Sequence, residues 1–131
     1  MTALQPAVEA GELPKLAKKN LGSPDETRTF DKGKFEVVTI GELKLGRATF
    51  QPGWKWSTSV KPIAKTSSCQ VHHVGYTISG SMEGTLDDGT KFKIGPGDSF
   101  EIPPGHDAWV VGNEAVVYLE FLGAGEYAKR K

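Results

Sequence analysis

Short segments in which apolar and polar residues alternate, separated by glycine- and proline-rich turns, constrain the fold of this chain more than any other feature. Alternation with a period of two is typical of β-strands, whose successive side chains point to opposite faces of a sheet. From about Thr29 onward the predicted strands are residues 35–40, 43–50, 71–78, 81–86, 91–94, 99–102, 108–111 and 115–121. No long helical pattern interrupts them, so the sequence predicts an all-β sandwich or barrel.

One turn is predicted in detail. Asp88-Gly89 lies between the alternating segments 81–86 and 91–94. Asp and Gly tolerate the positive φ angles of a type I′ turn, so we expect a tight hairpin at this point.

The first residues differ in character from the rest. Residues 1–24 carry scattered Ala, Glu, Lys and Pro, with a short helical pattern only between Leu13 and Leu21. We interpret them as an N-terminal arm. The remaining residues, 25–131, are of a size that one domain with one hydrophobic core commonly has.

Composition excludes several classes of partner. Sixteen basic and sixteen acidic residues cancel, and without a Lys/Arg-rich run the electrostatic footprint of nucleic-acid binding is missing. No stretch approaches the roughly 20 apolar residues that cross a bilayer, and the first residues lack the apolar block of a signal peptide. We therefore expect a cytoplasmic protein with no membrane partner. The single cysteine, Cys69, has no internal disulfide partner, which leaves it as a packed hydrophobe, a metal ligand or a nucleophile.

Two motifs in the second half are specific. Pro96-Gly97-Asp98 is followed, after a predicted strand, by Pro103-Pro104-Gly105. With the run from Cys69 to Gly80 they resemble the two conserved motifs of the cupin superfamily. The resemblance implies a double-stranded β-helix, the jelly-roll barrel of cupins, over about residues 25–122.

A narrower resemblance does not define a reaction. The run Pro52-Gly53-Trp54-Lys55-Trp56-Ser57 and the run from Pro104 to Trp109 are similar to a group of small stand-alone bacterial cupins. Cupins include dioxygenases, isomerases, lyases, sugar-binding proteins and storage proteins, so the fold leaves the activity open.

The chain departs from the ligand pattern that the cupin resemblance implies. Metal-binding cupins carry His-x-His and then Glu in the first motif; here Ser67, Cys69 and His73 stand at those positions. In the second motif Ala108 stands where the family has a histidine, and His106 comes two residues earlier. The usual three histidines and one glutamate are therefore absent.

A different ligand set is predicted from the alternation of strand side chains. Cys69, Val71 and His73 share one face, and His72 lies on the other. The resemblance places the Cys69 face inside the barrel, and His106 joins it if its strand begins directly after Gly105. We therefore expect Cys69, His73 and His106 to converge on one point.

A thiolate and two imidazoles suit a divalent transition metal, zinc, iron or copper, and three protein ligands leave one position open. Structural alternatives exist for each residue. Cys69 can be a packed hydrophobe, His73 can be satisfied by a backbone carbonyl, and His106 can close the Pro-Pro-Gly turn.

Further residues are candidates for the walls of a pocket and for support of the ligands. The candidate walls are Trp54, Trp56, Tyr76 and Trp109. Trp54 and Trp56 are two apart and face one side if they lie on a strand, where core or dimer-interface packing is the alternative. Gln70 and Asp107 are candidates to orient imidazoles, although a turn-stabilising role fits Asp107 equally well. Glu101 is a candidate general base if it faces inward, and an ordinary exposed strand residue otherwise.

The leading hypothesis is a metal-binding cupin that acts on or binds a small organic acid, sugar or aromatic compound inside the barrel, with oxygenase, isomerase and lyase chemistry all compatible. The alternatives are a small-ligand-binding or sensing barrel without metal, and a structural protein whose barrel is packed shut. The resemblance also implies a homodimer, with residues before Phe30 exchanged between subunits to cover a sheet edge.

Overall fold

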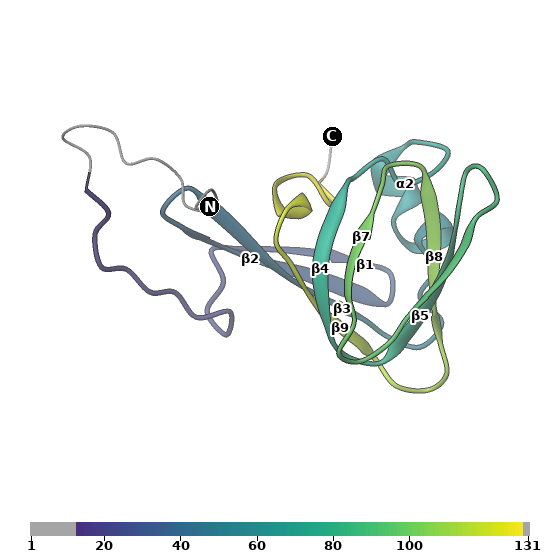
Figure 1. Cartoon of the computed structure of the whole chain (residues 1–131), viewed down its shortest axis with the longest axis horizontal. Helices are drawn as coiled ribbons and strands as arrows, with labels where there is room; N and C mark the ends of the chain where they lie inside the picture. The colour runs from purple at the N-terminus through teal and green to yellow at the C-terminus, as the bar shows by residue number, and fades with distance from the viewer. Residues whose placement is uncertain (1–12, 130–131) are drawn as a thin grey trace, which may run out of the picture.

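The computed structural model describes residues 13–129 of the chain (Figure 1). Of the predicted arm, residues 1–12 lie outside the described residues. The strands are β1 (Glu26–Phe30), β2 (Gly33–Ile40), β3 (Leu43–Phe50), β4 (His73–Ser79), β5 (Ser81–Leu86), β6 (Lys91–Ile94), β7 (Ser99–Ile102), β8 (His106–Val111) and β9 (Val116–Glu120). The helical segments are α1 (Trp56–Ser59), α2 (Lys61–Ala64) and a 3₁₀ turn, η1 (Gly123–Gly125). None of these helices has the length and apolar character needed to span a bilayer.

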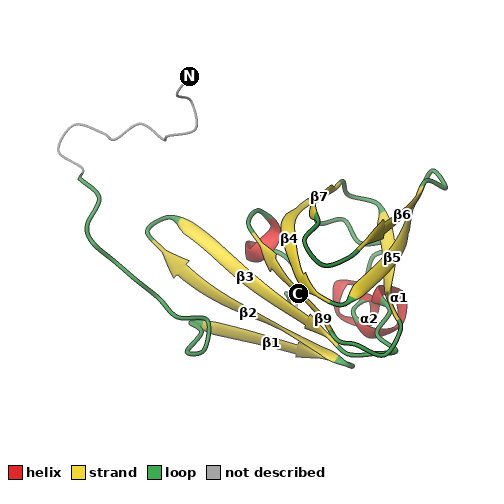
Figure 2. Cartoon of the chain, turned by 60° about the horizontal axis from the view of Figure 1, so that its bottom comes forward, coloured by secondary structure: helices red, strands yellow, loops and turns green. Residues whose placement is uncertain are grey.

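The strands form two antiparallel sheets that curve around a common interior (Figure 2). The larger sheet has six strands in the order β1-β2-β3-β9-β4-β7, and the smaller has three in the order β6-β5-β8. The all-β prediction is confirmed. Strands adjacent in sequence pair as hairpins in β1-β2, β2-β3 and β5-β6. The pairs β3-β9, β4-β9, β4-β7 and β5-β8 join strands that are distant in sequence, as in a double-stranded β-helix.

The core lies between the two sheets and is built by alternation. Along β9, Val116, Tyr118 and Glu120 are buried, whereas Val117 and Leu119 are half exposed. The larger sheet and the smaller one both contribute side chains to one hydrophobic cluster, among them Phe35, Phe50, Met82, Ile94 and Ala108. The same alternation carries a carboxylate, Glu120, into this interior.

The N-terminal region differs from the sequence analysis in two ways. Strand β1 is not among the predicted strands because its sequence, Glu-Thr-Arg-Thr-Phe, has no alternating apolar residues, and the side chain that it buries is Arg28. The short helical pattern between Leu13 and Leu21 does not form a helix; residues 13–20 are exposed and have no regular structure. A helix this short is not stable without a surface against which its apolar side can pack.

The segment that carries the two tryptophans is also not a strand. Trp54 lies in a turn, and Trp56 is the first residue of α1. Both side chains are nonetheless buried, and Trp54 stacks on Phe50 with ring centroids 3.8 Å apart. The predicted strand from Val71 begins two residues later, at His73.

The predicted hairpin between β5 and β6 is confirmed, but its turn is not type I′. Gly89 has a φ of 94°, whereas Asp88 is not among the residues with positive φ. The amide of Leu86 donates to the Thr90 carbonyl over 2.8 Å. Three residues therefore form the loop, and the glycine alone takes the left-handed position, as in a type I turn with a G1 bulge.

Candidate metal centre

Cys69, His73 and His106 come together from three segments of backbone. The amide of Cys69 donates to the His106 carbonyl over 2.8 Å, which joins the segment before β4 to the start of β8. Gly105, with a φ of 91°, makes the turn that allows β8 to begin at His106. His73 is the first residue of β4 and pairs with Ile102 of β7.

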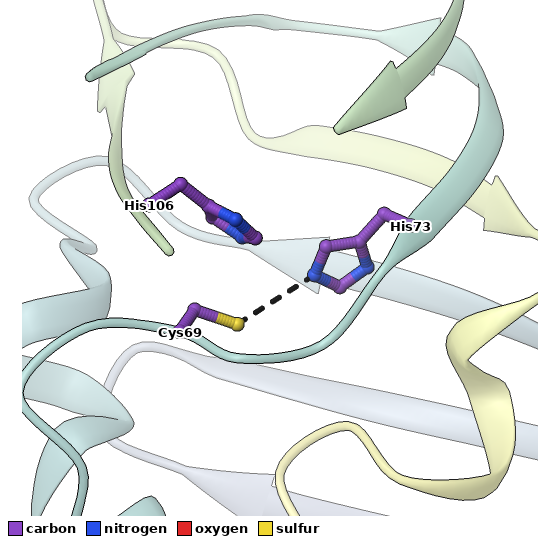
Figure 3. A group of neighbouring side chains, drawn as sticks. All are labelled: Cys69, His73 and His106. Atoms are coloured by element: carbon purple, nitrogen blue, oxygen red, sulfur yellow. Dashed lines mark hydrogen bonds between the residues drawn. The ribbon is translucent and has the colours of Figure 1, made fainter. Parts of the chain in front are cut away.

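The three side chains point toward one another inside the fold (Figure 3). Their candidate ligand atoms all lie within 4.8 Å of one another, and all three residues are buried. Cys69 Sγ is 3.7 Å from His73 Nε2. A sulfur and a nitrogen bound to one tetrahedral zinc ion, at about 2.3 and 2.0 Å, lie roughly 3.6 Å apart, so this pair needs almost no movement to bind one.

Both imidazoles are held in orientation by a hydrogen bond at Nδ1. His73 Nδ1 donates to Glu120 Oε1 over 2.5 Å, and His106 Nδ1 donates to the Pro103 carbonyl over 2.7 Å. With Nδ1 used in this hydrogen bond, Nε2 is the ring nitrogen of each histidine that could bind a metal. Histidines that bind metals are typically fixed in this way, by a carboxylate or a backbone carbonyl on the other nitrogen.

Glu120 contacts the candidate ligand His73 but is not among the site residues predicted from the sequence. It is fully buried, and its Oε2 also accepts hydrogen bonds from the amides of Val74, at 3.1 Å, and Gly123, at 2.8 Å. The signal was present in the predicted strand 115–121, where alternation places Glu120 on the same face as Val116 and Tyr118. A glutamate on the inner face of a predicted strand is a candidate site residue.

The buried environment sets the protonation of two ligands. Burial raises the pKa of the Cys69 thiol to about 12, and the nearby carboxylates of Glu120 and Asp107 act in the same direction. Burial, together with the neighbouring His73, lowers the pKa of His106 to about 4. At neutral pH and without a metal, Cys69 is therefore a thiol and His106 a neutral imidazole, so neither side chain carries a charge.

A cavity of about 20 Å³ adjoins both histidines. Its walls include Phe50, Trp54, Trp56, His73, Met82, Phe100, Ile102, His106, Ala108, Tyr118 and Tyr127. Such a volume holds about one water molecule. The interior therefore has no room for the sugar or aromatic compound that the sequence led us to expect inside the barrel.

Tyr127 covers the centre from the C-terminal side. Its ring contacts the His73 imidazole edge-on, with centroids 5.3 Å apart. Burial raises the pKa of Tyr127 well above its usual value, and Cys69 and Glu120 raise it further. Arg28 holds this segment, because its Nη1 donates to the carbonyls of Ala124, at 2.9 Å, and Tyr127, at 2.6 Å.

A second pocket, of about 490 Å³, lies at the surface beside the centre. It is lined by α1, α2, the Cys69–His72 segment and the C-terminal residues, and Trp56, Cys69, Gln70 and Tyr127 are among its walls. This volume is within the range of roughly 300–1,000 Å³ that small-molecule sites occupy. Trp56 and Tyr127 border both this pocket and the inner cavity.

His72 and the candidate base Glu101 lie on the surface of the protein, away from the candidate centre. His72 points to the surface, as expected, and pairs with Glu101 at 2.7 Å. The side chain of Glu101 is 68% exposed, so its predicted role as an inward-facing base is wrong. Alternation along β7 explains this, since the neighbouring Ile102 takes the inner position.

The residues expected to orient the imidazoles contact other groups. Gln70 Nε2 donates to Ser68 Oγ over 2.9 Å and reaches neither histidine. Asp107 Oδ1 accepts from the amides of Ser57 and Ala108, so it stabilises the backbone.

Two of the predicted pocket walls also lie elsewhere. Tyr76 is on the outer face of β4 and is 41% exposed. Trp109 is half buried on the outer side of β8, with Lys55 Nζ 5.5 Å from its ring centroid.

Comparison with known proteins supports the fold. No family model matches the chain, and no curated protein sequence matches it. Among solved structures, a mutant oxalate decarboxylase from Bacillus subtilis aligns with a TM-score of 0.55 and 21% identity over 79% of this chain. KdgF from Halomonas aligns with a TM-score of 0.50 and 23% identity, over 70% of this chain and 79% of its own. A protein of unknown function from Rhizobium leguminosarum aligns with a TM-score of 0.53 and 18% identity, over 82% of this chain and 98% of its own.

These similarities define the class of protein. Oxalate decarboxylase and KdgF have the cupin fold, and this chain has the cupin fold as well. The chain spans only 29% of the length of the decarboxylase, and identities below 25% carry the fold alone. The candidate centre of one cysteine and two histidines is a feature of this chain's own residues.

Proposed function

We propose that this protein is a metal-binding cupin in which Cys69, His73 and His106 hold one divalent transition metal, zinc, iron or copper. The observation that carries the proposal is the convergence of three buried ligand atoms within 4.8 Å, with both imidazoles turned so that Nε2 faces inward. Packing alone does not require a buried carboxylate behind a histidine, whereas a ligating histidine does use one. Soft thiolate and imidazole ligands favour these metals over magnesium or calcium.

A bound metal would serve as a Lewis acid or would activate a water molecule, and iron or copper would add redox chemistry. The residues of the chain supply the surroundings for either use. The aromatic and aliphatic walls of the inner cavity exclude bulk water, and Glu120 fixes His73.

The small organic molecule would bind in the surface pocket, next to the centre. The inner cavity is too small for it, whereas the pocket of about 490 Å³ has the size of a ligand site and shares Trp56 and Tyr127 with the inner cavity. Gln70, Thr66 and His72 offer polar groups on an otherwise largely apolar lining. An oxygenase, isomerase or lyase reaction is compatible with this arrangement.

Elemental analysis of protein purified without a polyhistidine tag or added metal tests the proposal. We expect close to one equivalent of zinc, iron or copper in the wild type and less than a tenth of that in the Cys69→Ser, His73→Ala and His106→Ala variants. His72→Ala is the matched control, because it removes a neighbouring imidazole from the surface and should keep the metal. Metal-free wild-type protein that also fails to bind added zinc would contradict the proposal and favour a cupin that binds its ligand without metal.

A further inference from the structure

We infer that Trp54 and Tyr127 donate hydrogen bonds to the non-protein ligand of this metal, and that this ligand is the size of water: a water molecule, hydroxide or a small inorganic anion. The inference rests on the proposed function, since it concerns the coordination position that the three side chains leave open. It assigns to two aromatic residues a positioning role toward a ligand in the inner cavity.

The first argument is that both residues carry a donor without a partner. Trp54 Nε1 and Tyr127 Oη are buried side-chain atoms with no hydrogen-bond partner among residues 13–129, and both residues are at most 2% exposed. A buried donor without an acceptor is destabilising, and most buried polar atoms in native proteins are satisfied. Thr77 Oγ1 is a third such atom, but Thr77 does not line the inner cavity, so Trp54 and Tyr127 are the two residues whose donors a ligand in that cavity could satisfy.

The second argument is location. Trp54 and Tyr127 line the same cavity of about 20 Å³ as His73 and His106. The remaining walls are mainly hydrocarbon, so the acceptor must come from whatever occupies the cavity. With a metal held by Cys69 and both Nε2 atoms, the imidazoles would have no lone pair left to accept these hydrogen bonds, whereas a water molecule, hydroxide or small anion on the metal would present one.

The third argument is rigidity. Trp54 is held by its stack on Phe50, with ring planes 4° apart, and by a hydrogen bond of 3.0 Å from the Val110 amide to the Trp54 carbonyl. Tyr127 is held by Arg28 through its carbonyl. Both donors are thus fixed before a ligand arrives, which reduces the entropy lost on binding.

The volume of the cavity sets the selectivity. About 20 Å³ admits one water molecule or an anion of two or three atoms and excludes larger groups. An organic substrate would stay in the surface pocket, which shares Trp56 and Tyr127 with the inner cavity.

Azide titration of cobalt-substituted protein tests this inference. The cobalt–thiolate absorption reports that the metal is bound to Cys69, and the shift of the visible bands reports azide. We expect Trp54→Phe and Tyr127→Phe each to weaken azide binding about tenfold, because a hydrogen bond to a charged acceptor is lost. The matched controls are Trp109→Phe and Tyr76→Phe, which make the same changes on the outer surface and should shift the azide Kd less than twofold.

The outcomes separate the two proposals. No cobalt–thiolate band in the wild type would overturn the metal site and this inference with it. An intact band with azide affinity unchanged in both variants would overturn this inference alone. If Trp54→Phe does not fold, as judged by circular dichroism, Tyr127→Phe decides, because it removes a single oxygen and leaves the ring contacts in place.

Discussion

Replacement of Glu120 by glutamine provides the most direct test of how the metal centre is built. Glu120 is fully buried and accepts three hydrogen bonds, from His73 Nδ1, the Val74 amide and the Gly123 amide. Glutamine has nearly the same shape, so Glu120→Gln keeps the packing. It removes the negative charge and replaces one accepting oxygen by an NH₂ group that cannot accept.

The expected effect follows from these contacts. If the amide oxygen stays with His73, the NH₂ group faces two backbone amides; if it turns, the imidazole loses its acceptor. Either arrangement weakens the support of the His73 ligand, which typically costs ten- to a hundredfold in metal affinity, or about 1.4 to 2.7 kcal/mol. The buried amides left without an acceptor lower the free energy of unfolding by a further ~1–3 kcal/mol.

Competition with a fluorescent zinc chelator measures the loss of metal affinity, and urea unfolding of the metal-free protein measures the loss of stability. Glu101→Gln is the control, because Glu101 makes the equivalent contact with the surface histidine His72. A zinc Kd for Glu120→Gln within threefold of the wild-type value, with native stability, would show that the carboxylate does not support a metal ligand.

Three further predictions concern protonation and assembly. The pKa of His106 is about 4 in the folded protein, below its ordinary value of 6.5, so unfolding takes up a proton between these pH values. The free energy of unfolding of metal-free protein should fall by about 3 kcal/mol from pH 6.5 to 4, and His106→Gln should lose most of this slope in urea titrations. Because the Cys69 pKa is raised to about 12, metal binding at pH 7.5 should release about one proton per ion, detectable with an indicator dye, and Cys69→Ser should release none. We also expect a homodimer whose sedimentation mass drops to that of a monomer when residues 1–18 are deleted; an unchanged mass would exclude the arm from assembly.

The sequence was informative where the fold follows a simple period. Alternation located most of the strands and put His73 and His72 on opposite faces, and the cupin resemblance indicated that His73 lies on the inner one. The start of β8 at His106 depended on Gly105, whose positive φ a glycine adopts without strain. These are local properties, so they can be derived from neighbouring residues.

The support of the site could not be derived in the same way. Glu120 meets His73 from a strand 47 residues away, and the Pro103 carbonyl that orients His106 is a backbone atom with no sequence signature. Gln70 and Asp107 were expected to take these roles because they are close in sequence to the ligands. The carboxylate behind His73 comes instead from the pairing of β4 with β9, which brings Glu120 opposite Gly75.

Arg28 connects the outermost strand to the candidate centre, although the two are far apart in sequence. It belongs to β1, the first strand in the order of the larger sheet, and its side chain donates hydrogen bonds to the carbonyls of Ala124 and Tyr127. A second chain that bound at this end of the sheet would restrain β1. Through the guanidinium group of Arg28 it would also restrain the segment whose tyrosine ring contacts His73.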